Sequence, residues 1–212
     1  MMKRFPSQIF LVAICATLAV LAGCSKRVMV PPRVDLSAYN AIGLVTFSSN
    51  SEGNLQQFAT QKFVETLQSS QSGVRILELG NKKYVLESVK RDQLDHESIR
   101  AIGEKYRVDA IIIGHMEVTD VKPTVNFSKL ITTMSVSADV EASLTTRLYE
   151  TDSGATAWTS SVRGKENVAH VGLTSRGPVH FGADDPEAAY GKLVNGLVYS
   201  ITRDFRVRYV KQ

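Results

Sequence analysis

The chain has 212 residues, with 25 Lys and Arg against 21 Asp and Glu, and its two cysteines are Cys15 and Cys24. Both cysteines lie near the N-terminus, which excludes a disulfide framework, a cysteine metal site and a cysteine nucleophile from the rest of the chain. Lys3 and Arg4 lie in a segment that we expect to be removed. Without them, 23 cations face 21 anions, and the net charge of +2 does not indicate nucleic-acid binding.

Residues 1–23 have the layout of a secretory signal peptide. Lys3 and Arg4 form a basic head, the apolar run from Ile9 to Ala22 follows, and small residues precede position 24. The run has about 14 residues, fewer than the roughly 20 that span a bilayer core, which argues against a permanent transmembrane helix. Cys15 lies inside this segment and is expected to serve there as a small apolar residue.

Residues 21–24, LAGC, resemble the lipobox of bacterial lipoproteins. The resemblance implies cleavage before Cys24, a diacylglycerol on its sulfur and acylation of the new amine, with no cofactor beyond this covalent lipid. Two or more acyl chains give stable anchoring, since each buried methylene contributes about 0.8 kcal/mol. Ser25 resembles the residue that directs lipoproteins to the outer membrane, so the expected location is its periplasmic face. The alternative for Cys24 is a small buried residue in a helix.

The sequence predicts three parts: a cleaved signal peptide over 1–23, a lipidated tether over 24–37, and one domain over 38–212. The tether contains two prolines among mixed polar residues and is expected to be extended. Removing the signal peptide leaves enough chain for one domain that buries about 70% of the surface of its unfolded state.

The first half of the domain predicts alternating strands and helices. Residues 41–47 form a short apolar run typical of a buried strand. A helix is expected over 54–70, with Asn54 as its N-cap and an apolar stripe every four residues. A strand over 74–80 and two helical pieces within 82–106 follow. The continuous apolar run at 108–118 indicates a strand that is buried on both faces.

The second half predicts paired strands and a closing helix. From Met134 to Leu148 apolar and polar residues alternate strictly, which is the pattern of a long strand with one wet face. The turn residues ETDSG and a partner strand, ATAWTSSVRG, come next. Asp185, Pro186 and Glu187 begin the final helix. Its inward stripe is Tyr190, Leu193, Leu197, Ile201 and Phe205.

Several of these stretches resemble one known family. AYNAIGLVTF resembles its first strand, IGEKYRVDAIIIGHM a helix that enters a strand ending in Gly, and TTRLYETDSGATAW a strand pair joined by a Ser-Gly turn. The family is that of the curli-secretion lipoprotein CsgG, with the exopolysaccharide-export lipoprotein PelC and the peptidoglycan-synthase activator LpoB as relatives. The resemblance covers residues 38–206. It implies a single α/β sandwich of the TolB N-terminal or anticodon-binding-like type, a mixed sheet of about five strands with three or four helices.

Two regions test the resemblance to the curli channel, whose subunits contribute strands to a membrane pore. Such strands need about nine to eleven residues with one apolar face toward lipid. The two candidate regions are instead interrupted by polar residues and proline, namely Lys122, Pro123, Lys129, Arg163, Lys165, Asn167 and Arg176. The sequence therefore favours a lipoprotein that does not span the membrane, with a ring-forming secretion channel as the alternative.

Enzyme motifs are absent from the sequence, so catalysis is not expected. There is no G-x-S-x-G elbow, no phosphate-binding glycine loop and no H-E-x-x-H pair. His115 and Glu117 fall on one side of a strand and are expected to form a hydrogen-bonded pair. His170 and His180 lie in one loop, where solvated histidines are a simpler interpretation than a metal site. Trp158 is expected to pack against neighbouring strands rather than to bind a glycan.

Residues 164–184 are rich in glycine and predict a loop or weak hairpin outside the core that contacts a partner. Its length exceeds the usual connection between elements. The candidate contact residues are Val171, Leu173, Arg176, His180 and Phe181. A basic cluster at the C-terminus, from Arg203 to Lys211, has two interpretations: contact with anionic lipid or glycan, or cations placed favourably near a helix C-terminus.

Together these features predict a lipoprotein on the periplasmic face of the outer membrane. It is expected to act without catalysis as an assembly component or regulator of an envelope secretion, export or cell-wall machine. The expected partners are the outer membrane through the lipid, and either further copies of the chain or another envelope protein.

Overall fold

The structure is a computed structural model that describes residues 27–124, 137–169, 171–172 and 179–211. The chain divides into two compact units. The larger unit is Pro32–Arg206, and the smaller unit combines the two chain ends, up to Pro31 and from Val207.

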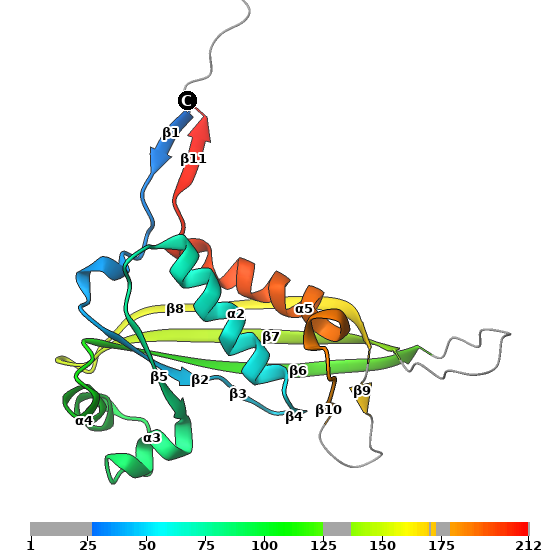
Figure 1. The fold of residues 1–212 in the computed structure, drawn as a ribbon, viewed down its shortest axis with the longest axis horizontal. Helices are drawn as coiled ribbons and strands as arrows, with labels where there is room; N and C mark the ends of the chain where they lie inside the picture. Colours follow the sequence, from blue (N-terminus) through cyan, green and yellow to red (C-terminus); the bar gives the residue numbers. More distant parts are fainter. Residues whose placement is uncertain (1–26, 125–136, 170, 173–178, 212) are drawn as a thin grey trace, which may run out of the picture. The chain divides into compact units, whose positions relative to one another are not determined.

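A mixed sheet forms the centre of the larger unit (Figure 1). Its strands run in the order β5, β2, β6, β7 and β8. Strand β2 is parallel to β5 and β6, whereas β6, β7 and β8 are antiparallel to one another. Their bounds are Ile76–Asn81 for β5, Ile42–Thr46 for β2, Ala110–Thr124 for β6, Ser137–Glu150 for β7 and Thr156–Ala169 for β8. The predicted α/β sandwich with a mixed sheet of about five strands is confirmed.

Within the described residues, four α-helices cover the sheet unequally (Figure 1). Helices α2 and α5 pack on one face, and α3 and α4 lie on the other. Their bounds are Leu55–Ser70 for α2, Lys82–Ser88 for α3, His96–Tyr106 for α4 and Pro186–Ile201 for α5. The predicted break within 82–106 is therefore real. Two short 3-10 helices, Leu36–Ala38 and Thr202–Phe205, complete this unit.

Each sheet face has its own apolar core. On the α2 and α5 side, Phe63 and Leu67 pack with Ile112 and the even-numbered apolar residues of β7. On the α3 and α4 side, Ile99 and Ile102 pack with Ile111. Because Ile111 and Ile112 are both fully buried on opposite faces, the prediction that this strand is covered on both sides is confirmed.

Strand β7 shows the predicted alternation. Residues 138, 140, 142, 144, 146 and 148 are completely buried, whereas the residues between them are partly or fully exposed. Since side chains of a strand point alternately to opposite faces, this pattern puts one face of β7 under the helices and the other toward solvent. The alternation at 134–136 lies outside the described residues.

The helix starts were predicted with unequal success. Asp185 caps α5 as expected, because its carboxylate accepts a hydrogen bond of 3.1 Å from the Ala188 amide. Asn54 precedes α2, but its side chain does not cap that helix. Its amide nitrogen instead donates to the Ala183 carbonyl at 3.1 Å, and its oxygen accepts a hydrogen bond from the Tyr190 hydroxyl. Tertiary contacts to the end of the chain have replaced the local cap.

The segment after β2, expected to be a loop, contains two short strands. Strand β3, Ser48–Ser49, pairs with β6. Strand β4, Glu52–Gly53, belongs to a second, three-stranded sheet with β10, His180–Phe181, and β9, Val171–Gly172. Gly53 has a φ of +100°, and a Cβ there would lie 1.7 Å from the Phe181 carbonyl oxygen, so the pairing requires glycine.

The Gln71 side chain links segments near both ends of the larger unit, and Trp158 of β8 packs against the final 3-10 helix. Gln71 accepts a hydrogen bond from the Leu36 amide at 2.7 Å and donates to the carbonyls of Val34 and Phe205 at 2.7 and 2.9 Å. Leu36 was expected in the tether, yet its side chain is fully buried. Trp158 is buried against the Phe205 ring at 4.6 Å between centroids, as its packing interpretation predicted.

The smaller unit is a two-stranded ribbon. Strand β1, Arg27–Val30, pairs antiparallel with β11, Arg208–Lys211, with Arg27 opposite Lys211 in register. We refer to these two strands as the ribbon. Residues Arg27–Val30 of the predicted tether are therefore paired with the C-terminal strand, a contact that local sequence patterns do not reveal.

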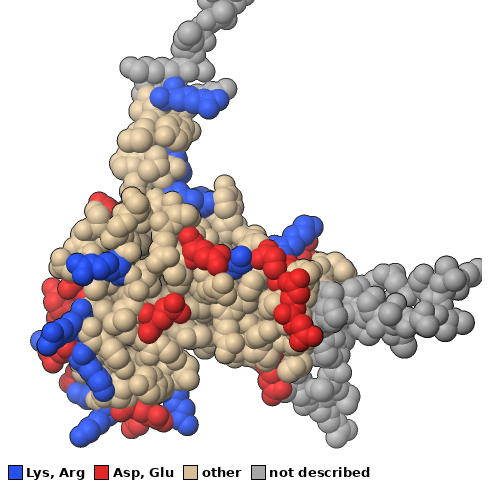
Figure 2. Space-filling model, in the orientation of Figure 1, with Lys and Arg blue, Asp and Glu red and all other residues tan. Residues whose placement is uncertain are grey.

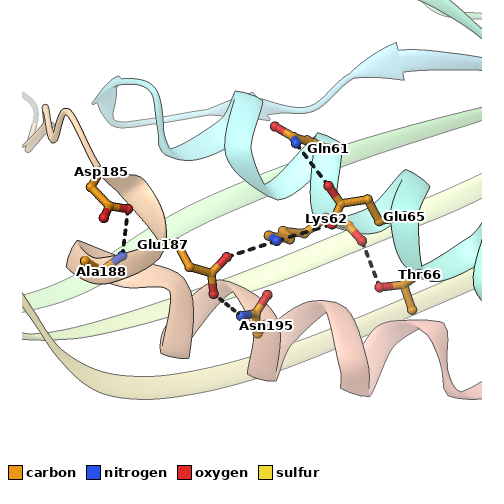
Figure 3. A network of polar contacts seen from close by, with 8 residues as sticks. All are labelled: Gln61, Lys62, Glu65, Thr66, Asp185, Glu187, Ala188 and Asn195. Carbon is orange, nitrogen blue, oxygen red and sulfur yellow. Dashed lines mark hydrogen bonds and ion pairs between the residues drawn. The ribbon is translucent and has the colours of Figure 1, made fainter.

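A polar network joins α2 to α5 (Figure 3). Lys62 of α2 lies 2.9 Å from a carboxylate oxygen of Glu187 and 3.2 Å from Glu65, and Asn195 donates to the other Glu187 oxygen at 2.8 Å. The shared hydrogen bond with Lys62 is the main reason that the pKa of Glu187 is lowered, and the hydrogen bond with Glu187 in turn raises the pKa of Lys62.

We predict that Glu187→Gln destabilises the protein in a pH-dependent way. A lowered folded-state pKa means that the ionised carboxylate stabilises the fold above the unfolded-state pKa, and that this contribution is lost as the pH falls through the folded-state pKa. At neutral pH the loss should be below about 1 kcal/mol, because the pair is partly exposed, and it should vanish in acid. Urea unfolding across this pH range measures the difference.

The matched control is Glu87→Gln, which removes an exposed ion pair of 3.8 Å between Lys83 and Glu87 on α3. That variant should unfold like the wild type at every pH. If both variants lost the same stability, the network between α2 and α5 would have no special role.

Candidate functional site

The uncovered part of the sheet is the candidate site. Helices α3 and α4 cover β5, β2 and the start of β6, and their core contains no residue from β8. The remaining surface consists of odd-numbered residues 139–147 of β7 and 159–167 of β8, with His115, Glu117, Asp120 and Lys122 of β6. We call this surface the open face.

Charges on the open face are paired across neighbouring strands. Arg163 of β8 lies 3.3 Å from Glu141 of β7, and Lys165 lies 3.8 Å from Asp139. Asn167 also donates to Asp139, at 2.9 Å. The surface carries equal numbers of each sign, with Lys122, Arg147, Arg163 and Lys165 as cations and Glu117, Asp120, Asp139 and Glu141 as anions.

The open face is exposed to water, and its positive and negative charges have a fixed arrangement across the strands. Exposed ion pairs contribute only about 0.2–1 kcal/mol each to stability. Holding the strands together is therefore a weak explanation for this arrangement of charges. Because its positive and negative charges balance, the open face also has no net positive potential that would attract a polyanion. The arrangement suits recognition of another polar protein surface, where matching charges set register and specificity.

A cavity of about 360 Å³ lies where the open face meets α3. Its polar lining includes Ser48, Lys82, His115, Thr145 and Arg147, and none of its lining residues is acidic. His115 and Ser48 are joined at 2.9 Å between Nδ1 and Oγ. His115 was expected to pair with Glu117, and that prediction is wrong because β3 brings Ser48 directly opposite it. These groups can hold an anionic or hydroxylated side chain of a binding partner.

Strand β8 is the outer strand of the sheet in the described part of the chain. One of its sides pairs with β7 along 14 residues, and the other side leaves backbone donors and acceptors available. Exposed strand edges bind extended segments of other chains, and charged side chains restrain indiscriminate pairing. Arg163 and Lys165 on β8 fit that restraining role.

The outer edge of β6, unlike that of β8 over the described residues, is hydrogen-bonded by a side chain. The Asn50 side chain accepts a hydrogen bond of 2.8 Å from the Val118 amide and donates one of 3.0 Å to the Val118 carbonyl. One amide side chain thus replaces a strand neighbour at the point where the β6 register shifts. Asn50 was not recognised from the sequence, where it reads only as a turn former.

The predicted contact residues have different locations. Cys24, Leu173 and Arg176 lie outside the described residues, as do Lys129 and His170. Val171 lies in β9, and His180 and Phe181 lie in β10. The His180 side chain is 54% exposed and lies 3.9 Å from Glu52.

The prediction that residues 164–184 lie outside the core is wrong at both ends. Strand β8 continues to Ala169, and Val168 is buried in the main core. Phe181 is fully buried and packs edge-on against Tyr190, with 5.8 Å between ring centroids. The glycines concealed this continuation, because Gly164 lies within β8 opposite Ala142 and does not end the strand.

The basic cluster at the C-terminus is divided between the two compact units. Arg206 stacks on the Tyr199 ring, with 3.7 Å to its centroid, and donates to the Tyr199 carbonyl in the last turn of α5. This contact matches the interpretation of a cation near a helix C-terminus. Arg208 and Lys211 belong instead to the ribbon.

Two absences hold for the described part of the chain. No group of three or more His, Cys, Asp or Glu residues there is arranged to hold a metal ion. Over the same residues, no helix has both the length and the apolar character that crossing a membrane requires.

No family model and no curated protein matches the chain. Among solved structures, the PelC dodecamer from Paraburkholderia phytofirmans matches 86% of this chain and 98% of its own, at 12% identity and a TM-score of 0.47. Lipoprotein GNA1162 from Neisseria meningitidis matches 76% and 97%, at 16% identity and 0.38. The LpoB C-terminal domain from Salmonella enterica matches 71% and 92%, at 11% identity and 0.37. PelC and LpoB, which the sequence resemblance named, are both among these structures.

We predict that two neighbouring substitutions in β10 differ strongly in their effect on unfolding free energy. Phe181→Ala should cost about 3–5 kcal/mol of unfolding free energy, because it leaves a cavity beside Tyr190. His180→Ala should stay within about 0.5 kcal/mol, since its side chain is mostly exposed. Chemical denaturation of both variants measures the contrast. A stable Phe181→Ala variant would return this residue to the set of contact residues.

Proposed function

We propose that the protein is a lipid-anchored envelope lipoprotein that works by binding other proteins and not by catalysis. Acylated Cys24 holds it on the periplasmic face of the outer membrane. There it serves as an assembly component or regulator of a machine for secretion, export or cell-wall synthesis. The open face carries the binding part of this proposal, because it is a wide polar surface that stability does not require.

The anchor part of the proposal rests on the sequence. Residues 1–24 combine a basic head, a short apolar run and the LAGC motif, and each piece is needed for lipoprotein processing. An anchor at the N-terminus of the mature chain leaves the sheet free to meet partners in the periplasm.

The absence of catalysis is proposed from how the candidate groups are used. The imidazole of His115 contacts Ser48, and Glu117 lies among paired charges on the open face. Catalysis needs a nucleophile or base that converges with stabilising groups on one reacting atom. The cavity at His115 supplies donors for binding, and its lining includes no carboxylate that could serve as a base.

A secretion channel of the curli type is the alternative, and the strand faces disfavour it. Residues 138, 140 and 142 of β7 are buried in the core with α5, so this face is not available to lipid. The opposite face carries Lys122, Arg163 and Lys165, all exposed. Cations at the midplane of a membrane strand cost about 2–4 kcal/mol each.

Cys24→Ala tests the anchor. We expect the precursor to stay uncut or the protein to leave the membrane fraction, because the sulfur that carries the diacylglycerol is missing. Mass spectrometry of the wild type should show a lipid-modified cysteine as the first residue of the mature chain. A soluble mature protein that begins elsewhere would remove the basis for a lipoprotein.

A photo-crosslinking amino acid at Ser161 tests the open face. Ser161 is exposed at the centre of β8 and contacts Thr145 at 2.9 Å. In intact cells we expect this position to form a covalent adduct with a protein neighbour, whereas the same probe at Arg100, exposed on α4, should not. The mass of the adduct distinguishes a second copy of the chain from another envelope protein. Equal labelling at both positions, or none at Ser161, would contradict the proposal.

A further inference from the structure

Exposed large apolar side chains are concentrated in the smaller unit, which contains the ribbon. Seven large apolar side chains are prominently exposed in the described residues, and four of them, Met29, Val207, Tyr209 and Val210, belong to the smaller unit. Met29 is 60% and Tyr209 67% exposed. Isolated two-stranded ribbons are marginally stable in water, so an element of this kind gains from a surface that covers it.

The register places the most exposed apolar residues side by side. Met29 lies directly opposite Tyr209, and Arg27 lies opposite Lys211 one step toward the chain ends on the same face. A thioether and an aromatic ring with a polar tip form the centre of that face. Tyrosine favours the boundary between water and lipid, because its ring is apolar and its hydroxyl stays hydrated.

All charges in and around the ribbon are positive. Residues 25–34 and 205–212 contain no Asp or Glu, while Arg27, Arg208 and Lys211 lie within the two strands. The visible side of the ribbon carries blue side chains and no red ones (Figure 2). This composition complements an anionic surface and would repel a second ribbon of the same charge.

The predicted anchor fixes the distance to such a surface. Two residues separate Cys24 from Arg27, and an extended chain spans at most about 3.6 Å per residue, so the Cα atom of Arg27 is held within about 11 Å of that of Cys24. Electrostatic attraction persists over about 8 Å at physiological ionic strength. The short connection therefore keeps this end of the ribbon near the range in which lipid phosphates attract cations.

We propose that the ribbon is a second membrane contact, in which the Met29 and Tyr209 face lies in the interface of an anionic phospholipid membrane. This inference rests on the lipid anchor of the proposed function. The ribbon cations bind lipid phosphates, and the apolar pair enters the boundary region. The anchor supplies attachment, and the ribbon limits how freely the protein turns about it.

The first test uses the acyl-free mature chain, residues 25–212, with vesicles that contain phosphatidylglycerol and with neutral phosphatidylcholine vesicles. We expect co-sedimentation with the anionic vesicles only, weakened by salt. Arg27→Gln should lower this binding about fivefold, as expected for about 1 kcal/mol per cation near a membrane, because Arg27 lies on the same face as Met29 and Tyr209. Arg27→Lys should bind like the wild type, which separates loss of charge from opening of the ribbon. Arg100→Gln, an exposed arginine on α4, is the matched control and should have no effect.

The second test places a probe on the ribbon. In the lipidated protein, the emission of Tyr209→Trp should shift to the blue in anionic relative to neutral vesicles and be quenched by brominated phosphatidylglycerol. The protein with Tyr209, whose only tryptophan is the buried Trp158, should show neither change. Unchanged emission in anionic vesicles, or equal binding to neutral ones, would overturn the proposal. So would a dimer that forms without vesicles and requires Tyr209. Because the first test uses a chain without lipid, its result does not depend on acylation of Cys24.

Discussion

The structure depends on the register of β7. Its even-numbered residues are buried under the helices, and its odd-numbered residues form the middle of the open face. A shift of one residue would turn the apolar set outward and bury the charged set, including Asp139 and Glu141. The pairing with both β6 and β8 over nearly the full strand excludes that shift. The register of β7 therefore determines both which residues form the core and which form the open face.

The helices cover the two faces of the sheet unequally, and this leaves the odd-numbered face of β7 available for binding. The α2 and α5 layer extends along β7 and β8 and buries Val140, Leu144 and Trp158. The α3 and α4 layer ends over β6, and β3 and Asn50 complete the β6 edge beyond it. A second full helix layer would have required apolar residues at positions 141 and 163, where the chain instead has an ion pair.

Local patterns predicted elements well and long-range contacts poorly. The alternation in β7, the continuous apolar run in β6 and the Asp185 cap each depend on neighbouring residues, and each was correct. The role of Asn54 depends on Tyr190 and Ala183, far along the chain, so local reasoning assigned it a cap. The continuation of β8 was missed for a similar reason, because glycine signals a loop unless a partner strand is known. The open face was implied by the alternation, but its extent followed only from where α3 and α4 end.

The ribbon also has a consequence for the order of events during synthesis. Strand β1 lies far before β11 in the chain, so β1 remains without its ribbon partner until β11 has been made. Contacts between such distant segments form late, since ordering of the chain between them comes first. A chain that stops before Arg208 keeps the whole larger unit but cannot form the ribbon. The ribbon therefore reports that synthesis has passed β11, which folding of the larger unit does not.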